Sequence, residues 1–440
     1  MVPHSTHHVG NDGVIVKDDE GQLSSTMLME RFTMLFLPKG YPHSVTSDYG
    51  SYQRWVFVQN TLGSVTYMLS THALLTSVGV GLSTSLPFAA AISWVLKDGL
   101  GASALVLFAS RYSTSLDYDL KRFKFRGDLL HNLGVFMEVC TPLAPGYFLP
   151  LASLSNVAKG IAGLIYGATR ASLNKSFALK ENLGDITAKY QSQGMAAYLT
   201  GMAIGTTVGL MMTSISIFTN MAVVCGLSLC HMACSYRSLK TIRFRTLNIQ
   251  RSTILIRHWL QNRQVLSIEA VNKMEDFVKP TSMVDQIQVN FGSSIEQAFD
   301  LKEGHNGEHI IGEINEAVNK GNGERYTYVV KPMVERKDGK LHFHVLFIDT
   351  GSSSSSSSPS SSAMTSTNDI IQRLLLKSYF HCILLNDGGD VNNIDTLYGQ
   401  FLNDLQHPST TTTSPINGGG TQWSLNFILY EYNDLIIKLE

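Results

Sequence analysis

The chain has 440 residues and a formal net charge of −1 at pH 7. This length is enough for two or three domains with buried cores, and the lack of a basic excess argues against nucleic acid as a partner. The five cysteines are an odd number, and three of them lie in one apolar stretch. The composition therefore excludes a disulfide framework and favours a reducing compartment.

Residues 1–30 have no apolar run behind a basic start, so no secretory signal is predicted there. They are also too acidic for a typical transit peptide. We expect a flexible leader, and we interpret His4, His7 and His8 as part of it rather than as a metal site.

Long uncharged stretches follow the leader. The range 55–96 contains no Lys, Arg, Asp or Glu and is rich in Gly, Ser and Thr. Such a range can hold one or two membrane helices of about 20 residues, because small residues let helices approach closely in a bilayer. The same composition also suits tightly packed helices of a soluble bundle. The next stretch, 93–110, is interrupted by Lys97 and Asp98.

A mixed-charge segment, 111–132, separates these stretches from a further apolar stretch at 133–157. The longest uncharged run, 190–236, can form a hairpin of two spanning helices, with a turn predicted at Thr219 and Asn220. Basic residues lie on both sides of this run. Because basic flanks favour the cytoplasmic side, we expect a hairpin or multi-pass membrane protein with a cytosolic C-terminal domain, in an organelle that the sequence does not specify.

Residues 246–440 contain charges of both signs and are predicted to form a smaller α+β domain. A β-hairpin is expected at 326–349 around a turn at 337–340, a helix at 370–385, and a strand or helix at 423–439. The Ser-rich and Thr-rich inserts cannot bury apolar area and are predicted to be disordered, at 351–364 and 407–421. The expected fold is therefore mainly α, with a Gly-rich, membrane-associated helical domain at 31–245.

The polar motif ENLGDITAKYQSQG, 181–194, lies directly before the longest uncharged run. If a helix starts near Asp185, then Lys189 and Gln193 share its face, and Asn182 lies just before it. As a structural element, Asp185 would cap the helix and pair with Lys189 for about 0.3–0.5 kcal/mol. The functional hypothesis is a polar stripe at the mouth of a helical bundle.

Two ionisable residues lie in apolar surroundings. Glu138 is flanked by GVFM and VCTPL, and an acid at membrane depth is expected to face a cavity or a cationic partner. Lys159 could form a Schiff base if burial lowers its pKa, or it could bury its stem and extend its amine to water.

Two groups of residues suggest metal sites, but neither is predicted to bind metal. Cys225, Cys230 and Cys234 lie among Met, Leu and Ala, which favours buried small hydrophobes. The stretch GHNGEH, 304–309, matches the H-x-x-E-H pattern of inverted zinc proteases. Its internal Asn-Gly favours a turn, so a solvent-exposed loop is expected.

Three segments together resemble one family. They are LPKGYPHSVTSDYGSYQRWVFVQN (37–60), WVLKDGLG (94–101) and ENLGDITAKYQSQ (181–193). They are similar to the ROOT UV-B SENSITIVE family, a former domain of unknown function also labelled vitamin B6 photoprotection and homeostasis. The resemblance is strong over roughly 31–245 and weak beyond.

The resemblance implies a membrane protein linked to vitamin B6 homeostasis and the ultraviolet-B response, with a family paralogue or another copy as partner besides membrane lipid. It brings no established reaction, so no catalytic residue is carried over. The candidate motif positions are Asp48, Lys97, Asp98, Glu138, Asn182, Asp185, Lys189 and Gln193.

The leading hypothesis is a non-enzymatic transport or scaffold role, with no cofactor. An alternative is a protein or enzyme that binds a vitamin B6 vitamer. There, Lys159 or Lys189 would approach the aldehyde of pyridoxal phosphate, and Arg170 or Arg126 its phosphate. A second alternative is a soluble helical interaction module.

Overall fold

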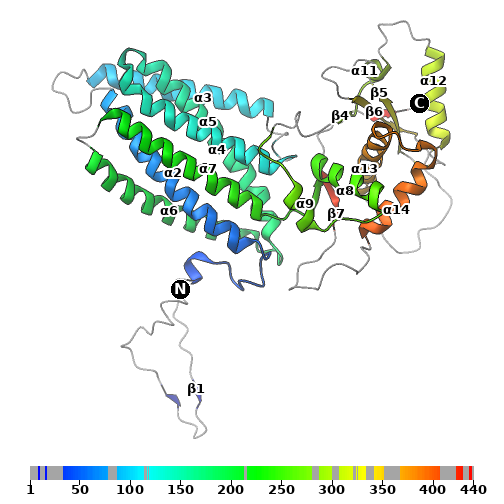
Figure 1. The fold of residues 1–440 in the computed structure, drawn as a ribbon, viewed down its shortest axis with the longest axis horizontal. Helices are drawn as coiled ribbons and strands as arrows, with labels where there is room; N and C mark the ends of the chain where they lie inside the picture. The colour runs from blue at the N-terminus through cyan, green and yellow to red at the C-terminus, as the bar shows by residue number, and fades with distance from the viewer. Residues whose placement is uncertain are drawn as a thin grey trace.

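The computed structural model places a bundle of long helices beside a C-terminal region of mixed structure (Figure 1). It describes strands β1 (His8–Val9) and β2 (Ile15–Val16), which pair antiparallel within the predicted leader. The other described residues are 33–77, 87–112, 116, 118–212, 216–279, 287–299, 307–320, 324, 326–332, 341–350, 367–406, 423–429 and 436–438.

The bundle is formed by helices of 21 to 30 residues. Their bounds are α2 (Tyr49–Ser77), α3 (Pro87–Tyr112), α4 (Leu120–Cys140), α5 (Phe148–Phe177), α6 (Leu183–Met212) and α7 (Ile217–Thr241). Two short 3₁₀ turns, Thr141–Leu143 and Pro145–Tyr147, connect α4 to α5. The prediction of a mainly helical protein is confirmed.

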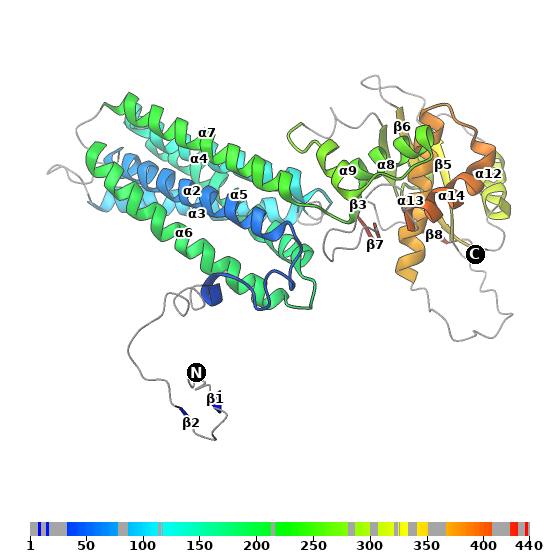
Figure 2. The same ribbon diagram turned by 60° about the horizontal axis from the view of Figure 1, so that its bottom comes forward.

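Helix α4 lies at the centre of the bundle, packed against α2, α5 and α7, whereas α3 packs chiefly on α5. The two helices predicted at 190–236 are present, but both pack along α2, which separates them (Figure 2). The predicted turn at Thr219 and Asn220 is wrong, because both residues lie in the first turn of α7. Ser216 caps that helix, and its side chain accepts a hydrogen bond from the backbone N–H of Phe218.

Glycines bring α6 close to α2. A Cβ atom at Gly201 would lie 2.5 Å from the Cβ atom of Ser64, and one at Gly205 would lie 2.9 Å from that of Met68. Only glycine fits at such distances. The spacing of four residues is the small-residue pattern of closely packed membrane helices, and the predicted close approach is confirmed for this helix pair.

The outward faces of the bundle carry many large apolar side chains, including Val95 at 70% exposed and Leu210 at 69%. Among the described residues, four helical segments are long and apolar enough to cross a membrane, namely Ile92–Arg111, Pro145–Phe177, Leu183–Met211 and Ile217–Thr241. Cys225 and Cys230 also point outward. Their interpretation as buried small hydrophobes is therefore wrong, and it holds only for Cys234.

The C-terminal region contains two small sheets. In the larger one, β6 (Leu341–Asp349) pairs with β5 (Tyr326–Pro332) antiparallel and with β4 (Ile287–Phe291) and β8 (Ile436–Lys438) parallel. In the smaller one, β3 (Thr246–Asn248) pairs parallel with β7 (Ser424–Leu429). The predicted β-hairpin is confirmed as β5 and β6, and the described residues of the 423–439 segment include strands β7 and β8. The hairpin turn and the whole of both inserts, 351–364 and 407–421, lie outside the described residues.

Helices cover these sheets. They are α8 (Ile249–Asn262), α9 (Ile268–Met274), α11 (Ile295–Phe299), α12 (Gly307–Lys320), α13 (Thr367–Asn386) and α14 (Ile394–Gln406), with a 3₁₀ turn at Val391–Asn393. The helix predicted at 370–385 is confirmed as α13. The loop predicted around GHNGEH is wrong for Glu308 and His309, which lie on α12, while His305 is outside the described residues.

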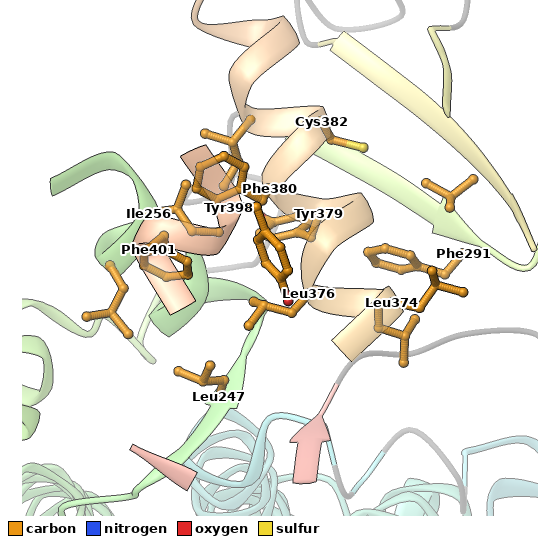
Figure 3. Packing of buried hydrophobic residues seen from close by; sticks show 14 of the residues in the cluster. Leu247, Ile256, Phe291, Leu374, Leu376, Tyr379, Phe380, Cys382, Tyr398 and Phe401 are labelled. Atoms are coloured by element: carbon orange, nitrogen blue, oxygen red, sulfur yellow. The ribbon is translucent and has the colours of Figure 1, made fainter. Parts of the chain in front are cut away.

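The C-terminal core is apolar and aromatic (Figure 3). Phe380 of α13 packs against Phe401 of α14, with ring centroids 5.5 Å apart, and Trp259 of α8 lies 5.5 Å from Phe401. The indole N–H of Trp259 donates to the carboxylate of Asp404 at 2.9 Å. This region therefore folds around a core typical of water-soluble proteins.

Candidate functional site

Helix α4 buries its polar face. Its buried residues include Lys121, Lys124, Asp128, Asn132 and Glu138, each at most 9% exposed. They lie along one side of the helix, which we call the polar stripe of α4. The opposite side presents apolar residues to the outside, namely Leu129, Leu133 and Phe136. This distribution is the reverse of that of a helix on the surface of a soluble bundle.

Glu138 joins three helices near the end of α4. Its Oε1 atom accepts a hydrogen bond from the ammonium of Lys159 on α5 at 2.5 Å, and its Oε2 atom accepts one from the hydroxyl of Ser70 on α2 at 2.9 Å. The same ammonium lies 5.4 Å from the ring centroid of Tyr67. The prediction that Glu138 faces a cationic partner is confirmed.

Gly134 makes room for this ion pair. A Cβ atom there would lie 2.8 Å from Cγ of Lys159, and the backbone oxygen of Gly134 accepts a hydrogen bond from Ser155 at 2.8 Å. The lysine stem therefore crosses α4 where that helix has no side chain.

Asp128 forms a second charged group, ten residues or almost three turns nearer the start of α4. Both of its carboxylate oxygens lie 2.7 Å from the ammonium of Lys124, and the hydroxyl of Ser235 on α7 donates to it at 2.5 Å. The Lys124 ammonium also lies 4.5 Å from the ring centroid of Tyr166 on α5. Helices α4, α5 and α7 thus converge on one buried ion pair.

His231 of α7 continues the polar contacts. Its Nδ1 atom lies 2.9 Å from the amide nitrogen of Asn132, and its Nε2 atom lies 3.5 Å from that of Gln59. A neutral imidazole has one donor and one acceptor nitrogen. One of the two amides must therefore present its oxygen to the ring. If the side-chain amide of Gln59 is flipped, its oxygen, which is otherwise buried without a hydrogen-bond partner, faces Nε2 of His231.

The start of α4 is tied to the C-terminal region. The ammonium of Lys121 donates to Glu275 at 2.6 Å and also to Asn272. Arg251 of α8 donates to the same Glu275 carboxylate at 3.1 Å. Burial alone would raise the pKa of Glu275, but Arg251 and Lys121 outweigh it and bring that pKa to about 2. Glu275 is therefore anionic at neutral pH and holds two buried cations.

Side chains of the 181–194 motif bind main-chain atoms of a preceding segment, residues 34–44. Asp185 accepts a hydrogen bond from the backbone N–H of Lys39 at 2.7 Å, and Gln193 donates to the backbone oxygen of Phe36 at 2.6 Å. Lys189 donates to the backbone oxygen of Met34, and Asn182 to that of Ser44 at 3.1 Å. Asp185 lies in the first turn of α6, as predicted, but the motif lysine binds the main chain of this segment instead of Asp185.

The remaining candidates have structural contacts. Asp48 accepts a hydrogen bond from the backbone N–H of Arg243 at 2.8 Å. Lys97 and Asp98 form an ion pair of 2.6 Å on α3. Arg170 lies 4.8 Å from the ring centroid of Tyr190.

The residues proposed to hold pyridoxal phosphate do not fit that role. A Schiff base needs a free lysine amine, but the amine of Lys159 binds Glu138 and that of Lys189 binds a backbone oxygen. Lys159 and Arg170 are also eleven residues apart on α5, about 16 Å along its axis. Arg126 is exposed on α4. Within the described residues, no group of three or more His, Cys, Asp and Glu could hold a metal ion.

A family model described as "Vitamin B6 photo-protection and homoeostasis domain" matches residues 22–263. The chain belongs to this family. The resemblance based on the three motif segments is therefore confirmed. The matched residues include the whole bundle and Arg251, while Glu275 lies beyond them.

Named relatives support the same assignment to the root UVB sensitive family. Protein root UVB sensitive 3 of Arabidopsis thaliana is 35% identical over 248 residues, 56% of this chain and 56% of that protein. Protein root UVB sensitive 6 of the same plant is 36% identical over 265 residues, 60% of this chain and 52% of that protein. RUS family member 1 of Dictyostelium discoideum is 32% identical over 264 residues, 59% and 50% of the two chains. The chain thus matches about half the length of these relatives, and no solved structure matches it.

Proposed function

We propose that the bundle is embedded in a membrane and that the polar stripe of α4 is the path of a small ionisable solute through it. The observation that carries this proposal is the arrangement of charge: Asp128 and Glu138 are buried with lysine partners, whereas the outward faces are apolar. Ionisable groups at membrane depth are costly, and they commonly mark solute or proton pathways.

The connections at the two ends of the bundle support one orientation. At the end away from the C-terminal region, the connections 78–86, 141–147 and 213–216 contain no Lys, Arg, Asp or Glu. At the other end, the connections contain the basic residues Lys180, Arg243 and Arg245 and the acidic residues Asp117, Asp119 and Glu181, and acidic residues contribute little to orientation. Basic residues favour the cytoplasmic side. The C-terminal region would therefore face the cytosol, in line with the expectation from the sequence.

Vitamin B6 vitamers are the first solutes to test, because the family description names this vitamin. They are small aromatic rings with ionisable nitrogen and hydroxyl groups. The stripe offers carboxylates as hydrogen-bond acceptors, and Tyr67 and Tyr166 lie beside it as aromatic faces. The chemistry of the stripe is therefore compatible with such a ring.

The full chain, reconstituted into sealed liposomes, tests the proposal by uptake of labelled pyridoxine. We expect uptake above that of empty vesicles and a fall of at least about tenfold in the variants Asp128→Asn and Glu138→Gln. The matched control is Glu316→Gln on α12, because Glu316 is exposed and pairs with Lys320 at 2.7 Å far from the stripe. Uptake equal to that of empty vesicles, or unchanged in both stripe variants, would contradict the proposal.

A further inference from the structure

Arg170 is a partly buried cation that has no carboxylate partner. It lies inside the candidate span of α5, seven residues or about 10 Å before the end of the helix. Two other cations inside the bundle are paired, Lys124 with Asp128 and Lys159 with Glu138. No carboxylate among the described residues pairs with Arg170, and its Nε atom is buried without a hydrogen-bond partner. A cation at this depth requires a compensating anion or water.

Two further polar atoms without partners lie one turn before and one turn after Arg170. The Tyr166 hydroxyl is buried and makes no hydrogen bond, and the same holds for Oδ1 of Asn174, a residue that is 1% exposed. The Asn174 amide nitrogen donates to the hydroxyl of Thr187 on α6 at 3.2 Å. Because a hydroxyl can donate as well as accept, this amide can turn and leave its N–H group open instead. One side of α5 thus carries a row of three donors for an anion.

The guanidinium of Arg170 is held by its flat face. It lies 4.8 Å from the ring centroid of Tyr190 on α6. Such stacking occupies the face of the guanidinium, whereas its N–H groups point outward in the guanidinium plane. The edge of the group is therefore available to an acceptor, between α5 and α6.

Arg170 also continues the polar stripe of α4 toward the C-terminal region. The Tyr166 hydroxyl lies beside the carboxylate of Asp128, and the Tyr166 ring contacts the Lys124 ammonium at 4.5 Å. The charges of Asp128 and Arg170 both act on the hydroxyl of Tyr52, a ring that is 1% exposed. A solute that leaves Asp128 in this direction therefore meets Arg170 next.

We propose that Arg170, together with Tyr166 and Asn174, binds the phosphate group of the solute. The inference rests on the function proposed above and adds the class of the solute, a small aromatic phosphate ester. A guanidinium binds phosphate through two parallel N–H bonds, and the phosphate charge compensates the unpaired cation. Among vitamin B6 vitamers, the phosphorylated forms carry this group. No imine is involved, so the distance from Lys159, which excludes a Schiff-base site, does not affect this one.

Binding to the full chain in phosphatidylcholine nanodiscs tests the inference. Equilibrium dialysis compares labelled pyridoxine with pyridoxine phosphate, an ester that has no aldehyde and cannot react with lysines. We expect the wild type to bind the ester at least about tenfold more tightly than pyridoxine. Arg170→Gln should bind both compounds equally, with its affinity for pyridoxine unchanged.

The matched control is Arg237→Gln, which should keep the preference for the ester. Arg237 is exposed on α7 and also lies over an aromatic ring, that of Trp55, at 6.0 Å. If Arg170→Gln does not fold, Arg170→Lys replaces it and should lower the preference at least about threefold, because lysine lacks the planar fork. Equal binding of both compounds by the wild type would overturn the inference. So would a preference that survives in the Arg170 variant or is lost in Arg237→Gln as well.

A lipid headgroup also carries phosphate, and discs with added phosphatidylserine separate the two sources. Anionic lipid repels the ester from every variant alike, so the ratio of dissociation constants in Arg170→Gln corrects for this repulsion. The corrected preference of the wild type should be the same in both kinds of disc. A preference lost in phosphatidylserine would assign the site to a lipid headgroup and overturn the inference.

Liposome uptake of pyridoxine, measured in parallel, separates this inference from the proposed function. Uptake without any preference for the ester overturns only the inference. Absence of uptake contradicts the proposed function, whatever the preference.

Discussion

The bundle encloses charged side chains beside its apolar clusters and has apolar outward faces, whereas the largest core of the C-terminal region is apolar and aromatic. The C-terminal region encloses aromatic rings such as Trp259 and Phe401, each 1% exposed. The bundle encloses Asp128 and Glu138, 1% and 2% exposed, and turns apolar residues outward. One chain therefore follows two burial patterns, which is what two different solvents, water and lipid, would produce.

The largest expected effect comes from removing one charge inside the bundle. Glu138→Leu leaves the Lys159 ammonium buried without its partner, and we expect a loss of about 3–5 kcal/mol in the free energy of unfolding. The double variant with Lys159→Met should recover most of that stability, because neither charge remains. Uptake should stay lost in both.

Circular dichroism recorded during unfolding in detergent measures the change in unfolding free energy, and the liposome assay measures uptake. If the double variant transported like the wild type, the pair would be a structural element only. If Glu138→Leu were as stable as the wild type, the Lys159 ammonium would not depend on Glu138 as its buried partner. The charges inside the bundle would then contribute less to its stability than their low exposure indicates.

The second prediction concerns the contact between the two regions. The pKa of Glu275 is about 2 in the folded protein, below its ordinary value of 4.5. A depressed acid pKa stabilises the fold fully above pH 4.5, and this stabilisation is lost as pH falls toward 2. The shift corresponds to on the order of 3 kcal/mol.

The thermal unfolding midpoint, measured between pH 6 and pH 2.5, should therefore fall more steeply in the wild type than in Glu275→Gln. Glu316→Gln is again the control, and its profile should follow that of the wild type. Parallel profiles for the wild type and Glu275→Gln would show that this carboxylate does not hold the two regions together.

The smallest expected effect concerns the motif of α6. Gln193→Leu removes one hydrogen bond to the main chain at Phe36, and we expect a loss of about 1 kcal/mol. Limited proteolysis should then cut residues 34–44 faster while the bundle stays intact. Gln297→Leu, on α11 in the C-terminal region, is the control and should leave this cleavage unchanged. Unchanged cleavage in Gln193→Leu would show that the motif does not hold the segment.

The long helices and the β5–β6 hairpin could be predicted because their signals are local. Uncharged runs and alternating residues depend on neighbours in the sequence. The polar stripe could not be predicted in the same way. Its residues appear as a mixed-charge segment, and their partners are distant: Lys121 and Glu275 are 154 residues apart.

The motif of α6 shows the same limit. Its shared helix face follows from the spacing of Asp185, Lys189 and Gln193, but its contacts are with main-chain atoms as many as 157 residues away. No side chain in the contacted segment signals such a contact, because backbone groups are the same at every residue. Glu138 was detectable only because a single acid in an apolar stretch requires a partner.

The central claim is that the outward face of the bundle lies in lipid, and a spin label at Cys230 tests it most directly. Cys230 is exposed on α7, inside the candidate span Ile217–Thr241. In a variant that retains only this cysteine, reconstituted into bilayers, collision rates with oxygen and with a water-soluble nickel chelate are compared. The account predicts frequent collisions with oxygen and few with nickel. Frequent collisions with nickel and few with oxygen would place this face in water and contradict it.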